Sequence, residues 1–350
     1  MPRRRMKDRR TAGKAGELPL RDVGFDVQQL RLNRKRAALT TRFSYRLAGL
    51  GGRWSVNRRF NMVNRNGRWL INRETGRTAM PWEVARYRLE PTRHFRVLAP
   101  TGVDSRAAGL PALLESAYAQ VRQRLPRSPL QRRYLVLIAG DARAARRLVP
   151  ELPGVEGLSA VTDAALRVEG PAQRVSEVVS LRVIVPWSRF TQLSSATRQE
   201  VLTHELAHAA LARRTSGRTP AWLQEGFALY VSRDDRRALA AAHLATTGTA
   251  RAARRGLSLS GLARPTSIAQ LSHDQLSPAY AYSSAAAFYI ADVYGERRLM
   301  TLLREFGNPE ISGPAGSRLT DRVMRKVLRV SSRRFERGLR TWIQTGGASG

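Results

Sequence analysis

The chain contains no cysteine among its 350 residues. This absence excludes a disulfide framework, a Cys-ligated zinc or iron–sulfur site and a cysteine nucleophile. No uninterrupted apolar run approaches the roughly 18 residues that a transmembrane helix needs. No apolar segment follows the basic first ten residues, as it would in a secretory signal. The sequence as written therefore predicts a chain without a membrane span or signal peptide, cytoplasmic by default.

Lysine and acidic residues are also scarce. Only four of the 61 basic side chains are lysine, and 27 acidic residues leave a formal net charge of +34. Residues 1–93 hold 24 basic and 7 acidic side chains, so half of this net charge lies in that segment. A basic region attracts polyanions such as nucleic acid, an anionic lipid surface or a charged wall polymer. A coding bias toward arginine and alanine explains the composition equally well, so the charge does not identify a partner.

The first part of the sequence alternates between apolar and polar residues, as antiparallel strands do. Strands are expected at residues 27–32, 37–47, 54–64 and 68–73. The Asn66-Gly67 pair predicts a type I′ hairpin turn, which needs positive φ at both central residues. One face of this sheet would be apolar, and the other rich in arginine; the apolar side chains are Leu39, Phe43, Phe60 and Trp69. Four strands cannot bury both faces, so we expect the following domain or an upstream segment to cover one of them.

Downstream of this meander the pattern alternates between strands and helices. Strands are expected at residues 94–98, 134–139, 158–168 and 178–186, helices at 110–125 and 141–152, and a mainly helical region after Ser194. We therefore predict the α+β class: an N-terminal antiparallel β-meander, then a small mixed sheet and a mainly helical C-terminal half. The predicted parts are a flexible basic lead-in (1–20), the antiparallel sheet domain (21–92), a second domain (93–345) and a flexible tail (346–350).

Residues 204–208 read His-Glu-Leu-Ala-His, an HExxH motif within a predicted helix. Possible N-cap residues stand just before it: Ser194, Ser195 and Thr197. At 100° per residue, His204 and His208 lie about 40° apart on one face, where both imidazoles can bind one tetrahedral metal ion. Glu205 is displaced by about 100°, which lets its carboxylate reach a metal-bound water without filling a coordination position. Composition alone predicts only about 0.003 such matches in the chain, so the motif indicates a metal site.

A catalytic zinc site needs a third protein ligand and keeps its fourth position for water. Glu225 is the candidate. We expect its helix to begin with Thr219 as N-cap and Pro220 as first helical residue, after a polar link long enough for the helix to fold back over the HExxH helix. The neighbours of Glu225 are apolar, and a carboxylate among them is costly to bury unless a positive charge such as a metal ion compensates it. A glutamate on a solvated helix face is the alternative interpretation.

These two segments resemble the gluzincin metallopeptidases. The HExxH segment is followed, after 16 intervening residues, by the glutamate of Ala-Trp-Leu-Gln-Glu-Gly-Phe-Ala-Leu-Tyr (221–230), which is similar to the WLxEGFA segment of the aminopeptidase N type. The closer resemblance is to bacterial peptidase MA-like domains, which combine HExxH with PxWLxEGxAxY. It continues through residues 280–288 and 294–299 to a closing helix with an apolar stripe of Phe335, Leu339 and Trp342, and so covers residues 93–345.

The resemblance implies a zinc-dependent peptidase with one zinc ion per chain. His204, His208 and Glu225 would be the metal ligands, and Glu205 the general base in the hydrolysis of a peptide or protein substrate. Residues 181–186 occupy the place of the edge strand that binds the substrate backbone in such enzymes. Tyr282 is the preferred oxyanion donor because it resembles the tyrosine of aminopeptidase-like enzymes, and Tyr280 is the second choice. Either tyrosine could instead pack within its helix.

The resemblance also bears on the first domain and on location. The meander is similar to NTF2-like sheets that precede such domains, usually together with helices and a membrane anchor or signal further upstream. We therefore expect a membrane-associated or extracytoplasmic protein if an upstream segment is missing here.

One residue departs from the family pattern, and one alternative function remains. Leu229 stands where several gluzincins have an acid that orients a ligand histidine, so another group would have to support the metal ligands. The alternative function is a catalytically weak or inactive peptidase scaffold whose Arg-rich N-terminal part binds a polyanionic partner. No recognisable nucleic-acid motif supports a third reading, and the oligomeric state is not predicted.

Overall fold

The computed structural model describes residues 17–76, 78–106, 108–125, 130–152, 154–246 and 258–346. Most of the predicted lead-in (1–20) and of the predicted tail (346–350) lies outside these ranges. The chain divides into two compact units. The first contains residues 1–115, 131–165 and 179–198, and the second contains residues 116–130, 166–178 and 199–350.

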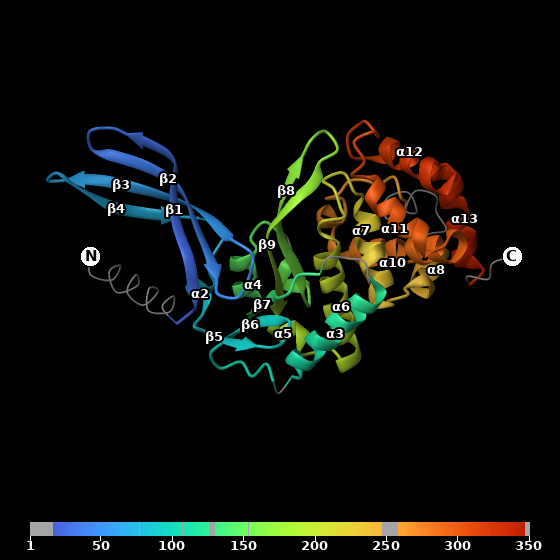
Figure 1. The fold of residues 1–350 in the computed structure, drawn as a ribbon, viewed down its shortest axis with the longest axis horizontal. Helices are drawn as coiled ribbons and strands as arrows, with labels where there is room; N and C mark the ends of the chain where they lie inside the picture. Colours follow the sequence, from blue (N-terminus) through green and yellow to red (C-terminus); the bar gives the residue numbers. More distant parts are fainter. Residues whose placement is uncertain are drawn as a thin grey trace. The chain divides into compact units, whose positions relative to one another are not determined.

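The first sheet is the expected antiparallel meander, with strand order β1-β2-β3-β4 (Figure 1). Its strands are β1 (Leu20–Leu32), β2 (Arg36–Leu47), β3 (Trp54–Arg65) and β4 (Arg68–Thr75). Asn66 and Gly67 have φ values of 51° and 77°, which confirms the hairpin turn predicted from the sequence.

The two faces of this sheet differ in polarity as predicted. Leu39 of β2 is paired with Phe60 of β3, and cross-strand partners share a face, so both lie on the apolar side. Alternate residues of the strands point to the other face, where four arginines are exposed: Arg31, Arg42, Arg59 and Arg73. A bulge between Asn61 and Met62 keeps Arg73 on that side, because it shifts the pairing of β4 by one residue.

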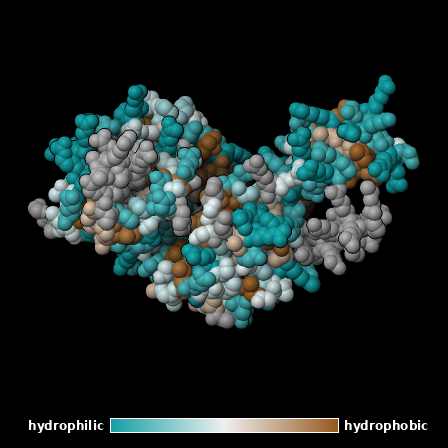
Figure 2. Space-filling model, turned by 180° about the vertical axis from the view of Figure 1, so that it is seen from behind, coloured by the Kyte–Doolittle hydropathy of each residue, from teal (hydrophilic) through white to brown (hydrophobic). Residues whose placement is uncertain are grey.

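The apolar face is covered at one end only. Tyr45 and Trp54, near one end of the sheet, are buried in a hydrophobic cluster with Trp82 and with Leu135 of the second sheet. Toward the other end, Phe25 is 52% exposed and Leu32 is 64% exposed. Figure 2 shows hydrophobic atoms at the surface of this sheet, at the upper right, among mainly hydrophilic ones. Among the described residues, the apolar face of the first sheet is therefore only partly covered.

The second sheet is mixed and has the order β5-β6-β7-β9-β8. Its strands are β5 (Tyr87–Pro91), β6 (Phe95–Pro100), β7 (Tyr134–Ala139), β8 (Val161–Glu169) and β9 (Arg174–Pro186). β5 was not expected. Because β5 pairs with β6, the predicted boundary at residue 92 lies inside this sheet.

The expected strand at residues 181–186 is the end of β9, which pairs in parallel with β7 on one side. In the order of the sheet β9 lies between β7 and β8, so β8 rather than β9 is the outermost strand. The sequence could not reveal this, because a continuous apolar run is typical of a strand buried between neighbours as well as of other apolar segments.

Helices follow in the later part of the chain, as predicted (Figure 1). The α-helices are α2 (Pro81–Val84), α3 (Leu110–Arg124), α4 (Ala142–Leu148), α5 (Trp187–Phe190), α6 (Ser195–Leu211), α7 (Ala221–Ser232), α8 (Arg237–Thr246), α10 (His273–Tyr289), α11 (Glu296–Glu305), α12 (Ser317–Leu328) and α13 (Ser332–Gln344). Phe335, Leu339 and Trp342 are buried along α13, as their helical spacing predicts. None of the helices in the described ranges has the length and apolar character to cross a bilayer.

Candidate metal centre

The HExxH residues lie in the C-terminal half of α6, with His208 in its last turn. Ser194, one of the three expected capping residues, accepts a hydrogen bond from the backbone N–H of Thr197 through its hydroxyl at 3.2 Å. Leu202, Leu206 and Ala209 lie within about 60° of one another on one side of the helix, and all three are buried. This packing fixes the rotation of α6 about its axis, and with it the direction of the two histidines.

Glu225 lies in the second turn of α7, but that helix begins differently from the prediction. Pro220 takes the N-cap position rather than Thr219, and it provides no side-chain hydrogen bond. The first free N–H groups of α7 instead donate to the carbonyl oxygens of Leu262 and Arg264. The N-cap prediction was therefore wrong, because a distant loop supplies the acceptors that a capping side chain would otherwise provide.

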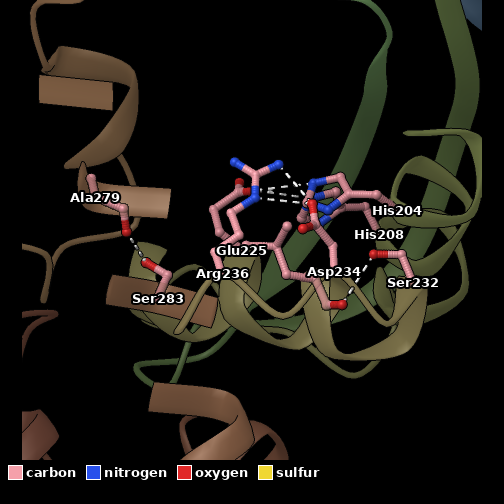
Figure 3. Close-up of polar contacts among 9 residues, drawn as sticks. His204, His208, Glu225, Ser232, Asp234, Arg236, Ala279 and Ser283 are labelled. Atoms are coloured by element: carbon pink, nitrogen blue, oxygen red, sulfur yellow. Dashed lines mark hydrogen bonds and ion pairs between the residues drawn. The ribbon is translucent and has the colours of Figure 1, made fainter. Parts of the chain in front are cut away.

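Three side chains converge in the second unit (Figure 3). Nε2 of His204 lies 3.2 Å from Oε2 of Glu225, and Nε2 of His208 lies 3.3 Å from the same oxygen. The two Nε2 atoms are 3.1 Å apart. This is the group of potential ligands found among the described residues, and its members come from two helices as the sequence predicted. Their side chains are 14–22% exposed, so the group is accessible from outside.

The spacing of these atoms fits a zinc ion. In a tetrahedral site with bonds of about 2.0–2.1 Å, neighbouring ligand atoms are about 3.3–3.4 Å apart. Hydrogen bonds account for the triangle less well. If both histidines donate to Glu225, two N–H groups face each other across 3.1 Å. If the Nε2 atom of one histidine carries no proton, the N–H group of the other histidine can serve at most two of the three contacts. A divalent cation would satisfy all three atoms at once.

His208 and Glu225 shift each other's pKa values because their charged atoms lie so close together. Burial by itself lowers the pKa of His208, but the charge and hydrogen bond of Glu225, together with the charge of Glu205, raise this pKa to about 9. Burial favours the neutral form of Glu225, yet the two histidines hold its pKa well below the usual range. A proton on His208 thus supplies the positive charge that Glu225 requires in the metal-free protein. Glu205 is itself buried, at 8% exposure, beside these groups.

Gly226, next to Glu225, allows α10 to approach α7 closely. A Cβ atom at this position would overlap the backbone carbonyl of Ser283 in α10. Ser284 also ties α10 to the end of α7, because its hydroxyl donates to the carbonyl of Asp234 at 2.8 Å. The glycine of the Glu-Gly pair therefore permits the helix crossing that brings the tyrosines of α10 into this region.

The two candidate tyrosines have different surroundings. They are two residues apart, and side chains about 200° apart point to opposite sides of a helix. The hydroxyl of Tyr282 donates to Oε1 of Glu336 at 3.1 Å, and its side chain is completely buried. The charge of Glu225, followed by burial and the charge of Glu205, raises the pKa of Tyr280 well above its usual value. The structure thus associates Tyr280, the second choice from the sequence, with the candidate ligands.

Sequence reasoning missed Arg236. Its guanidinium donates to Oδ2 of Asp234 from two nitrogens, at 2.7 and 2.9 Å (Figure 3). It also lies 5.8 Å from the centre of the Tyr280 ring. Its charge lowers the pKa of Tyr280, against the effect of Glu225. No sequence pattern distinguishes this arginine from the many others, so only the fold could reveal its position.

Among the described residues, no hydrogen-bonding group replaces the missing acid beside His204. Leu229 is fully buried, and Nδ1 of His204 is buried without a hydrogen-bond partner among the described residues. Metal-binding histidines usually donate this second N–H to a carboxylate or carbonyl, which orients the ring. Packing within the helices is left to orient His204.

Comparisons of the chain with protein-family models, curated proteins and solved structures gave no match.

Proposed function

We propose that this protein is a zinc-dependent peptidase with one zinc ion per chain. The observation that supports the proposal is the convergence of His204, His208 and Glu225, each with one ligand atom within 3.3 Å of the other two. In sequence and arrangement these residues resemble a gluzincin centre. A bound zinc ion would lower the pKa of a coordinated water toward 7 and polarise the scissile carbonyl.

The residues of the chain then have separate tasks. Glu205, next to the ligands but not one of them, takes the proton of the attacking water and later delivers it to the leaving amine. Tyr280 donates a hydrogen bond from its hydroxyl to the developing oxyanion. Its raised pKa keeps that hydroxyl protonated over the whole physiological range. The hydroxyl of Tyr282, the first choice from the sequence, instead donates to Glu336.

The first experiment measures metal content and peptide hydrolysis together. Purified protein should contain about one equivalent of zinc, and it should cleave members of a peptide library in a reaction that a chelator stops and added zinc restores. Zinc retained at full stoichiometry by His208→Ala would reject the ligand assignment.

Glu205→Gln separates binding from chemistry. This variant should keep the zinc and lose hydrolysis, because the amide has a similar size but cannot accept the proton. Unchanged turnover would remove Glu205 from the mechanism. Loss of hydrolysis together with loss of zinc would instead identify Glu205 as a structural residue.

A second candidate function has its own observation, the exposed arginines on one face of the first sheet. We propose that this face binds an anionic surface, such as a lipid membrane, with or without catalysis in the second unit. Vesicles with and without anionic lipid distinguish the two cases. Binding to the anionic vesicles should weaken with salt and fall when Arg42, Arg59 and Arg73 are replaced by glutamine. Equal binding to neutral vesicles would reject this candidate.

A further inference from the structure

The side of α7 opposite Glu225 borders a separate cavity. Phe227, Tyr230 and Val231 lie about 140–240° around the helix from Glu225, counted at 100° per residue. They line a cavity of about 330 Å³ within the second unit. Its other walls come from the end of α3, from Arg214 in the segment after α6, and from α11. This volume is at the lower end of the range for small-molecule sites.

The rim of the cavity is strongly positive. Its lining includes four arginines: Arg124, Arg214, Arg297 and Arg304. The acidic member is Glu296, and it already accepts a hydrogen bond from the hydroxyl of Tyr230 and lies 3.8 Å from Arg124. The cavity therefore carries a surplus of positive charge that an anion would neutralise.

Arg214 and Arg304 both line this cavity. Burial, followed by the positive charge of Arg304, lowers the pKa of Arg214. Arg214 also donates to the sulfur of Met300 at 3.6 Å. Like charges repel, so an anion that both guanidinium groups contact would relieve the repulsion between them.

The rest of the lining is apolar. Leu125, Phe227, Val231, Leu299 and Met300 surround the remaining space. Inorganic anions gain nothing from such side chains, whereas an alkyl or aromatic group that leaves water on binding them gains about 25 cal/mol per Å² of buried apolar area. The cavity combines the two kinds of surface that an amphipathic molecule has.

We infer that the cavity behind α7 binds a small amphipathic oxyanion, a carboxylate or phosphate group carried on a short apolar body. The anionic group would contact Arg214 and Arg304, and the apolar body would pack against Phe227 and Met300. A guanidinium presents parallel N–H donors that match either oxyanion in a bidentate manner. None of the candidate zinc ligands lines the cavity, so the inference is independent of the proposed peptidase activity.

Titration calorimetry on chelator-treated protein tests the site, with four probes that separate charge from apolar contact. Octanoate and octyl phosphate contain both parts of the ligand, inorganic phosphate lacks the apolar body, and octyltrimethylammonium has the same body with the opposite charge. Arg304→Gln removes one rim charge at an exposed side chain, so folding should not be affected. Arg318→Gln, an exposed arginine of α12 outside the lining, is the matched control for net charge.

The expected result is binding of octanoate or octyl phosphate that weakens with salt and falls at least tenfold in Arg304→Gln but stays the same in Arg318→Gln. Inorganic phosphate should bind more weakly, and octyltrimethylammonium should not bind. The inference is overturned if neither octyl anion binds, or if Arg304→Gln binds as tightly as the unmodified protein. Equal binding of the octyl cation, or of inorganic phosphate, would overturn it as well.

Discussion

His204 and His208 lie one helical turn apart, and each directs Nε2 at the same Oε2 atom of Glu225. Such a contact triangle is unusual for purely structural histidines, because the available protons cannot satisfy all of its members. The raised pKa of His208 and the lowered pKa of Glu225 have one physical origin, an opposite charge held in a poorly solvated place. A cation that binds there must replace the proton of His208.

The first prediction for these residues concerns the pH dependence of metal binding. Metal binding needs neutral His208, and in the metal-free protein this side chain stays protonated up to about pH 9. The apparent zinc affinity should therefore rise about tenfold per pH unit from pH 7 to 9 and then level off, with about one proton released per ion from His208. Competition with a chromophoric chelator measures the affinity, and titrations in two buffers measure the proton. An affinity that is constant over this range would contradict the assignment.

The second prediction compares the two tyrosines. Tyr280→Phe should lower kcat by about 10²-fold or more, as loss of an oxyanion donor does. Tyr282→Phe is the matched control: it loses the hydrogen bond to Glu336 and about 1 kcal/mol of stability, and kcat should change little. Peptide hydrolysis rates and thermal unfolding of both variants give the answer. The reverse pattern would return the role to Tyr282.

At the scale of elements, α7 connects most of the features that bear on function. It carries Glu225, its glycine admits α10, and its opposite side lines the arginine-rich cavity. The link that precedes it contains Arg218, which is buried at 2% exposure. The guanidinium of Arg218 donates to four backbone carbonyls beyond α11, those of Phe306, Asn308, Ile311 and Gly313.

Gly226→Ala tests the helix crossing. The added methyl group meets the backbone of Ser283, which cannot move without displacing α10, so we expect a loss of about 1–3 kcal/mol and a lower Tm. Gly51→Ala is the control, because a Cβ there meets no atom within 4 Å and should leave the Tm nearly unchanged. Equal Tm values for the two variants would show that α7 and α10 are not in close contact.

Arg218→Met tests the anchoring of the link before α7. The change leaves four backbone carbonyl groups without their donor, and those of Phe306 and Ile311 are buried. We expect it to destabilise the protein by more than about 3 kcal/mol in denaturant unfolding. Arg218→Lys keeps the charge but lacks the planar set of donors, so we expect a loss of stability smaller than that of Arg218→Met. A loss below 1 kcal/mol for Arg218→Met would mean that these hydrogen bonds contribute little.

For the whole molecule, charge is the dominant property. Of the 61 basic side chains, at most 27 can be matched one to one with acidic residues, and the surplus repels itself in the folded state. Ion pairs such as Arg182–Asp163 and Arg58–Glu83 relieve the repulsion locally inside the first unit.

We therefore expect salt to stabilise this protein. Raising NaCl from 10 to 200 mM shortens the screening length from about 30 Å toward 7–8 Å, which weakens the long-range repulsion more than the short ion pairs. The Tm should increase over this range, as differential scanning fluorimetry would show. A Tm that falls with salt would indicate that the ion pairs outweigh the net charge.

Much of the candidate site could be predicted from the sequence, since it depends on short-range geometry. The helical positions of His204, Glu205 and His208 follow from a period of 3.6 residues, and the alternation of β1 to β4 follows from a period of 2. Asn66-Gly67 predicted its turn because few other residues accept positive φ there. Even Glu225 followed from local chemistry, since a carboxylate among apolar neighbours needs a cation.

The remaining features were decided by tertiary structure. Which tyrosine of α10 lies near the candidate ligands depends on how that helix rotates against α7, and Tyr280 and Tyr282 are equally suitable until the crossing at Gly226 is known. The place of β9 between β7 and β8, the backbone acceptors at the start of α7 and the arginines behind it depend on segments far apart in the chain. Local periodicity carries no information about such partners, because long-range packing selects among arrangements that are locally equivalent.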